Sequence, residues 1–345
     1  MTQLRIGVFP PSFDDDGIDF VRNAEALGVD SLWAPEAWMF DALTPLAFYA
    51  AVTERMRLGT GIVQLGARTP ALLAMSALAL QKMSDGRFLL GVGTSGPQVM
   101  EGWHGVRFER PVTRTREEIE IIRLVASGER VSYDGKVHQL PLPDSQGRAL
   151  RSPVAGATIP IHVASMGPAN LRLTGELADG WIGTAFMPEH ADVYLDTIRE
   201  AAEAAGRSLD DIELSTAVGL EFADDPEEAG RRHAGGYAFT IGAMGSTSTN
   251  FYNQAFTRQG YGEGVEEVQR LWQAGDREAA AAAVPIEIGL HTNLLGRDED
   301  VLARLRMYRA AGISTLRLSF NVEGNAAKLD DVARLMDLVH TVNAE

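Results

Sequence analysis

The sequence contains no cysteine, and its only lysines are Lys82, Lys136 and Lys328. Without cysteine, disulfide frameworks, thiolate zinc sites, iron–sulfur ligation and a cysteine nucleophile are all excluded. The absence of cysteine also fits a reducing compartment. Redox chemistry in such a chain would have to come from a borrowed cofactor.

Positive charge is scarce as well: 31 basic side chains face 47 acidic ones, which gives a net charge of −16. Nucleic-acid binding needs a basic stripe that displaces phosphate counterions, so we expect no nucleic-acid partner. Long apolar runs are missing too. The N-terminal residues carry no apolar signal segment, and the stretch 70–80 is shorter than the roughly 20 residues that span a bilayer. We therefore expect a soluble, cytoplasmic protein without a membrane partner.

The chain does have length and a regular alternation of elements. Its 345 residues, 45% of them hydrophobic, suit one barrel-sized domain with insertions or two ordinary domains. Short β-rich runs alternate with amphipathic helices, and eight strands are predicted near residues 4–9, 30–34, 56–63, 86–92, 159–164, 179–183, 211–218 and 314–320. Eight such units without a linker predict a (β/α)₈ barrel of the α/β class, in one domain over residues 1–345. A doubly wound open sheet is the alternative.

Two segments interrupt this rhythm. Residues 128–156 form an excursion with a predicted hairpin around Asp134 and Gly135. Residues from about 237 to 295 are predicted to be a mostly helical insertion between the seventh and eighth strands. Elsewhere, Thr-Pro pairs at Thr44 and Thr69 predict helix starts, because threonine caps a helix and proline suits its first position.

Two motifs have competing interpretations. The acidic run Asp14 to Asp16 suits either a metal cluster or, as we prefer, the capped start of a helix. Gly91 to Gly96 match G-x-G-x-x-G, but no long helix opens at Gly96. In addition, Glu117, about 20 residues further on, is expected in a helix rather than at the end of a second strand. We interpret these glycines as a turn whose backbone can approach a planar ligand. The seven histidines show no ligand spacing, so no metal site is predicted.

In a barrel, the active site lies where the strands end. Ala164 to Asn170 connect a strand to a helix whose first amides would favour a phosphate, although an ordinary loop is an equal alternative. Glu36 is the acid directly at the end of the second strand and is the first candidate for a functional carboxylate. Three tryptophans near strand ends would suit an aromatic-walled pocket: Trp38, Trp103 and Trp181.

Three segments together resemble the luciferase-like oxidoreductases that use flavin or deazaflavin, specifically the branch that uses coenzyme F420. They are residues 57–106, with an Arg-x-Pro helix start and Ser-Asp-Gly-Arg-Phe before a glycine-rich strand end, then residues 164–183, and finally residues 241–268. The last segment resembles the helical insertion of methylenetetrahydromethanopterin reductases and their relatives. The fold of this family is a (β/α)₈ barrel.

The resemblance implies a set of cofactor-binding residues. It places a non-prolyl cis peptide between Gly61 and Ile62, where the backbone bulges against the deazaflavin ring. It places Ser165, Met166 and Gly167 at the cofactor phosphate. The remaining residues expected to bind the cofactor lie at strand ends: Phe9, Glu36, Gly93, Thr94 and Ser95.

The resemblance also implies an activity, a hydride transfer between C5 of the deazaflavin and a small organic substrate. Glu36 and Trp38 are the predicted catalytic residues. Ala37 stands where the family often has histidine, so a histidine acid/base is absent there, and proton transfer falls to Glu36, another side chain or water. The alternatives are an FMN-dependent monooxygenase of the same superfamily and a non-catalytic barrel that binds deazaflavin. Family precedent suggests a homodimer.

Overall fold

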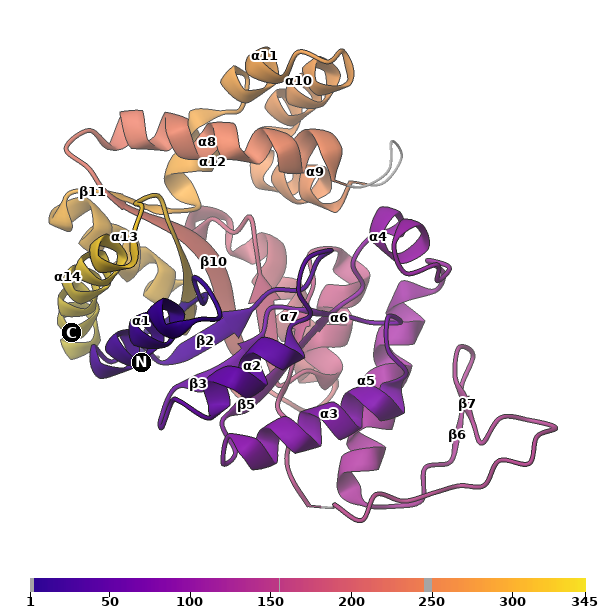
Figure 1. Ribbon diagram of the computed structural model, residues 1–345. Helices are drawn as coiled ribbons and strands as arrows, with labels where there is room; N and C mark the ends of the chain where they lie inside the picture. The colour runs from indigo at the N-terminus through magenta and orange to yellow at the C-terminus, as the bar shows by residue number, and fades with distance from the viewer. Residues whose placement is uncertain (1–2, 155, 245–249) are drawn as a thin grey trace.

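The computed structural model describes residues 3–154, 156–244 and 250–345, and its centre is a closed barrel of eight parallel strands (Figure 1). The pairing of β9 with β10, with Leu214 opposite Trp181, closes the ring. This confirms the predicted (β/α)₈ barrel and excludes the open sheet. The barrel strands are β1 (Arg5–Val8), β2 (Ser31–Ala34), β3 (Arg57–Thr60), β5 (Phe88–Gly93), β8 (Ile161–Ala164), β9 (Gly180–Gly183), β10 (Glu213–Phe222) and β12 (Thr315–Phe320).

Two short strands join the same sheet, β4 (Val63–Gln64) beside β5 and β11 (Leu294–Gly296) beside β10. The prediction for residues 237–295 contained no strand, because Leu294 and Leu295 continue a helical pattern. The helices that follow the strands are α1 (Asp15–Ala26), α2 (Leu43–Ala50), α3 (Pro70–Met83), α4 (Pro97–Gly102), α5 (Pro111–Ser127), α6 (Pro168–Leu177), α7 (Asp192–Ala204), α13 (Asp298–Ala310) and α14 (Asn325–Ala344).

Side chains alternate between the two sides of each strand, which divides the core into an outer shell and a barrel interior. On β12, Leu316 and Leu318 join the large core between the sheet and the helices. Arg317 lies between them and faces the interior. On β5, a Cβ on Gly91 would lie 1.9 Å from the carbonyl oxygen of Thr60, so only glycine lets β3 and β5 approach. The first glycine of the G-x-G-x-x-G match is therefore required by strand packing.

Each of three helices begins where a nearby side-chain oxygen accepts hydrogen bonds from its first amides. Asp14 caps α1 by accepting from the amide of Gly17, as expected, and Thr69 caps α3 by accepting from the amide of Leu72. The predicted start at Thr44 was wrong. α2 begins at Leu43 because Oδ1 of Asp41 accepts from the amides of Leu43 and Thr44.

The predicted excursion contains an antiparallel hairpin of β6 (Tyr133–Asp134) and β7 (Gln139–Leu140), which projects from the barrel in Figure 1. The helical insertion begins earlier than predicted, directly after β10, and lies over one end of the barrel (Figure 1). Residues 245–249 of the insertion lie outside the described residues. Its elements are α8 (Pro226–Ala243), α9 (Phe251–Phe256), a π-helical segment (Thr257–Tyr261), α10 (Gly262–Gln273), α11 (Arg277–Ala282) and α12 (Ile286–His291).

A second hydrophobic cluster consists mostly of side chains of the insertion, such as Ile241, Phe256 and Val268, and packs on Ala185 and Met187 after β9. At the amino-terminal end of the barrel, charged side chains close the interior instead. There Arg57 donates to both oxygens of Glu213, at 2.7 and 2.9 Å, and to Asp30. Within the described residues, no helix is both long enough and apolar enough to cross a membrane.

Candidate functional site

The mouth of the barrel has an apolar floor. Inside the barrel, Trp33, Leu89 and Ile182 form a small cluster, and side chains from the ends of β1, β3 and β8 pack on it: Phe9, Ile62 and Ala164. Gly93, at the end of β5, lies against Ile62: a Cβ at Gly93 would be only 3.0 Å from Cδ1 of Ile62. The structure thus brings together Phe9, Ile62 and Gly93, three residues predicted to bind the cofactor.

The peptide bond between Gly61 and Ile62 is cis. The cis bond itself was predicted at this position and is confirmed; its contact with a cofactor ring stays a prediction. Gly61 donates its amide to the carbonyl of Ala34 at 2.8 Å, which ties this turn to the end of β2. The bond lies between β3 and β4, where the chain leaves the barrel wall at the mouth.

The predicted phosphate loop, Ser165 to Gly167, joins β8 to α6. The Ser165 hydroxyl is buried and hydrogen-bonded to Oγ1 of Thr174 at 2.9 Å, so the loop presents its backbone. Gly167 is the N-cap of α6 and has no side chain to occupy the first amides of the helix. Such amides form an anion-binding site when a ligand supplies the acceptor.

A basic side chain from the insertion reaches this loop. Arg258 donates to the carbonyl oxygen of Met166 at 2.6 Å, and its buried Nε has no hydrogen-bond partner among the residues that the structure describes. Sequence reasoning missed Arg258, because the contact joins residues 92 positions apart and the resemblance of residues 241–268 assigned no role to a single side chain. An amide cluster with an adjacent guanidinium fits a phosphate group.

The backbone turns sharply after β5. Ser95 has a φ of 56°, in the left-handed region that residues with a Cβ rarely adopt. Thr94 and Ser95 are half-buried and lead into α4. These two predicted residues thus lie at the mouth, next to Gly93.

Glu36 is held by four donors. Arg68 donates to both carboxylate oxygens, at 2.8 and 2.7 Å, and the amides of Gln64 and Ala42 each donate to one oxygen at 3.1 Å. The Glu36 hydrogen bonds raise the pKa of Arg68 above its ordinary value. A carboxylate has about four acceptor positions, and all of them are used here. This geometry favours a positioning role for Glu36 over proton transfer.

The three tryptophans do not form one wall. Trp38 and Trp103 are exposed, at 50% and 66%, on the segments that follow β2 and α4. Trp181 is fully buried on the outer side of the barrel, where its indole donates to the carbonyl of Ser165 at 2.9 Å. The expectation of a three-tryptophan pocket was wrong for Trp181, because strand alternation turns its side chain toward α7 and not into the mouth.

A polar cluster lies at the ends of β10 and β12. Glu221 is buried and accepts from Nε2 of His233 at 3.0 Å, from Asn321 at 2.7 Å and from Arg232. Burial alone would raise the pKa of Glu221, but these hydrogen bonds hold it below its ordinary value. Burial lowers the pKa of His233 despite the carboxylate beside it. His233 lies on α8 and was missed, whereas both strand ends were expected to face the active site.

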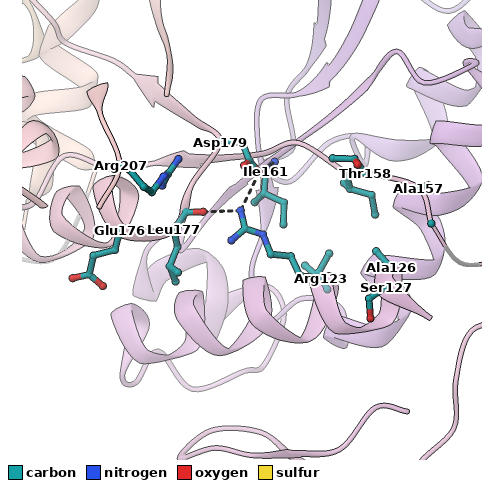
Figure 2. Close-up of a pocket in the computed structure, with 13 residues that line it drawn as sticks. Arg123, Ala126, Ser127, Ala157, Thr158, Ile161, Glu176, Leu177, Asp179 and Arg207 are labelled. Atoms are coloured by element: carbon teal, nitrogen blue, oxygen red, sulfur yellow. Dashed lines mark hydrogen bonds and ion pairs between the residues drawn. The ribbon is translucent and has the colours of Figure 1, made fainter. Parts of the chain in front are cut away.

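A cavity of about 560 Å³ opens at the opposite, amino-terminal end of the barrel (Figure 2). In Figure 2, Arg123 points toward Leu177 and Asp179, to which it donates at 2.6 and 3.1 Å. Arg207 donates to the carbonyl of Ala178 at 2.7 Å. The two cations thus stabilise the end of α6. This end of a barrel serves stability, so we place the functional site at the other end.

The same barrel fold occurs in known proteins. The family model of luciferase-like monooxygenases matches residues 14–315. The chain belongs to this family. A Mycobacterium tuberculosis protein named as a coenzyme F420-dependent oxidoreductase is 36% identical over 343 residues, with coverage of 96% of this chain and 98% of the relative.

Two further proteins extend the comparison. The 5,10-methylenetetrahydromethanopterin reductase of Archaeoglobus fulgidus is 26% identical and covers 86% of each chain. The solved coenzyme F420-dependent tetrahydromethanopterin reductase of Methanopyrus kandleri superposes with a TM-score of 0.79, at 22% identity and 99% coverage of both chains. The resemblance stated from the sequence is confirmed by these comparisons. Within the described residues, no group of three or more His, Asp or Glu side chains is arranged to hold a metal ion.

Proposed function

We propose that this luciferase-like protein is a coenzyme F420-dependent oxidoreductase, which passes a hydride between C5 of the deazaflavin and a small organic substrate. The observation that carries the proposal is the shared position of an apolar floor and an anion site at one end of the barrel. Phe9, Ile62 and Gly93 form the edge of the floor, and the loop from Ser165 to Gly167 lies beside it. The 36% identical relative, named for the same cofactor, supports it.

The residues at the mouth fit a flat, anionic cofactor. The Gly61–Ile62 turn and Gly93 would face the ring system, and Thr94 and Ser95 would line its edge. The Ser165–Gly167 amides and Arg258 would hold the phosphate against the field of an acidic protein. The bound cofactor supplies the hydride chemistry, and the barrel orients the substrate and excludes water.

The substrate would lie between the floor and the insertion. Trp38 and Trp103 would cover it from one side, and the Glu221–His233 pair would face it from the ends of β10 and β12. Because Nε2 of His233 binds Glu221, Nδ1 is the nitrogen left for the substrate. The pair thus places an imidazole nitrogen where it could exchange a proton with the substrate, whereas all acceptor positions of Glu36 are already used. We assign Glu36 the positioning of the segment from β2 to α2.

A cofactor titration tests the proposal. Adding oxidised coenzyme F420 to the protein should shift its absorbance and quench its fluorescence with saturable binding, and FMN should bind more weakly. The family description favours an FMN-dependent monooxygenase as the second candidate, and tight FMN binding without F420 binding would establish it. Bound F420 that never changes redox state with a panel of alcohols, imines and activated alkenes would identify a non-catalytic barrel.

We also propose a cytoplasmic homodimer. Leu72, Met75 and Met83 form an exposed apolar stripe on α3, at 50%, 60% and 55% exposure, and Phe48 extends it on the neighbouring α2. An exposed apolar stripe of this kind marks an association surface. A second copy of the chain fits it, because the apolar side chains of one stripe can pack against those of the other across a two-fold axis. Sedimentation should show a dimer that Met75→Glu converts to a monomer. Glu203→Gln, on the exposed side of α7, is the control that leaves it intact.

A further inference from the structure

Among the described residues, Arg317 is a buried cation without an acid beside it. It lies in the middle of β12, its side chain crosses the barrel interior, and it is only 4% exposed. One terminal nitrogen donates to the carbonyl of Gly183 at 2.7 Å, and its Nε is buried without a hydrogen-bond partner. In the described part of the chain no carboxylate compensates it: burial is the cause that lowers the pKa of Arg317, to about 10, so it stays protonated at neutral pH.

The charge lies directly beneath the proposed cofactor site. The guanidinium carbon is 5.4 Å from the centre of the Trp33 ring, one of the three buried side chains of the floor. Nη1 would be 3.5 Å from a Cβ at Gly61, at the cis peptide. Ser319, the next interior position on β12, is exposed, so the interior opens to solvent one step above Arg317. Arg317 thus occupies the boundary between the packed interior and the mouth.

An unpaired buried charge is unfavourable, because the interior does not replace the hydration that the guanidinium loses. The carbonyl of Gly183 and the face of Trp33 offset only part of this loss. At the other end of the barrel, by contrast, Arg57 is paired with Glu213 and Asp30. An anion in the mouth would complete the compensation of Arg317.

We propose that Arg317 stabilises the negative charge that the cofactor ring gains on reduction, so that the protein binds the reduced cofactor more tightly than the oxidised one; this rests on the function proposed above. Hydride transfer moves one proton and two electrons together. With the cofactor bound, the substrate C–H bond would break and a C–H bond would form at C5, the oxidised substrate would release its remaining proton to solvent, and the reduced ring would carry one additional negative charge. Arg317 keeps its own proton throughout. A fixed cation in a site of low dielectric stabilises such a charge more than water does.

The test compares the dissociation constants of oxidised and reduced coenzyme F420, measured anaerobically by fluorescence and absorbance titration. Arg317→Met removes the charge and keeps an unbranched side chain. It should weaken binding of the reduced cofactor about tenfold more than binding of the oxidised cofactor. Arg317→Lys keeps the charge and should retain most of the wild-type ratio. Arg258→Met is the matched control, since the phosphate charge is the same in both redox states and both constants should rise by one factor.

Equal weakening of both redox states by Arg317→Met would overturn the proposal and leave Arg317 a packing role. A second measurement needs no variant. In the wild-type complex, the reduced cofactor should lose its ring proton at a lower pH than it does free in solution, and an unchanged or higher pH would also overturn the proposal. Failure of the wild-type protein to bind F420 at all would instead contradict the proposed function.

Discussion

Arg68 and Glu36 form a bidentate ion pair at the mouth of the barrel, with Nη1 and Nη2 at 2.8 and 2.7 Å from the two carboxylate oxygens. The pair joins the segment after β2 to the segment before α3. The amide of Ala42 also donates to Glu36, so the carboxylate holds the whole connection from β2 to α2. The residue that the sequence marked as the first functional carboxylate therefore shapes the site through the backbone.

Replacing Glu36 by glutamine tests this positioning role. Glu36→Gln loses one of the two charged contacts and leaves Arg68 partly unpaired, so we expect the free energy of unfolding to fall by about 1–3 kcal/mol. Urea denaturation measures this loss. The pH profile of cofactor reduction should keep its shape, and loss of one limb of that profile with unchanged stability would identify Glu36 as a proton-transfer group.

Arg258 should contribute to cofactor affinity. Arg258→Met removes a guanidinium beside the Ser165–Gly167 loop, and a charged hydrogen bond to a phosphate is worth about 1.5–3 kcal/mol, so the dissociation constant of F420 should rise at least tenfold. Arg231→Met is the control, because Arg231 is an exposed residue of α8 that pairs with Glu227. Isothermal titration calorimetry decides the question, and equal affinities for the two variants would remove Arg258 from the phosphate site.

His162 should make the barrel sensitive to mild acid. It is fully buried in the interior, and burial lowers its pKa from 6.5 to about 4. The unfolded chain therefore binds a proton between pH 6.5 and 4 that the folded chain does not bind. Stability is complete above pH 6.5 and falls by up to about 3 kcal/mol as the pH drops toward 4. In His162→Gln, denaturation series across this range should show a flatter slope. A slope equal to that of the wild type would assign the acid sensitivity to other groups.

Gly91 should be indispensable for folding. A Cβ in Gly91→Ala would collide with the carbonyl of Thr60 at 1.9 Å, and the hydroxyl of Thr60 is hydrogen-bonded to both backbone groups of Gly91. We expect a loss above about 4 kcal/mol, seen as a strongly lowered melting temperature or insoluble protein. Gly102→Ala, in α4 with open space around its Cβ position, should melt like the wild type. A folded Gly91→Ala variant with wild-type stability would contradict the strand-packing explanation.

Local chemistry explains which predictions succeeded. The barrel strands are short buried runs, most of which contain β-branched residues or glycines that disfavour a helix, and Asp14 and Thr69 cap helices within three residues of themselves. The start at Thr44 failed because Asp41 accepts from the amides of Leu43 and Thr44, so the helix already includes Thr44. The local sequence pattern could not show which of the two residues, Asp41 or Thr44, caps α2.

The site was harder to predict because its partners are far apart in the chain. Glu36 was found, but its ion pair with Arg68 depends on how two loops meet. Arg258 and His233 reach the mouth from the insertion, where no sequence pattern pointed to either side chain. Arg317 did have a signal: a charged residue between Leu316 and Leu318 in a strand must face the side opposite to the leucines, and in a closed barrel that side is the interior.

Most side chains of the insertion's hydrophobic cluster come from the insertion itself, with Ala185 and Met187 of the barrel joining it, and Arg258 reaches across to the barrel at Met166. A segment with its own small core can open while the rest of the fold remains intact. A phosphate bound between Arg258 and the Ser165–Gly167 loop would connect the insertion to the barrel and stabilise its closed position. Amide hydrogen exchange in α8 to α12 should then slow when cofactor is added. Cofactor binding at the barrel would thus stabilise helices that lie outside the barrel.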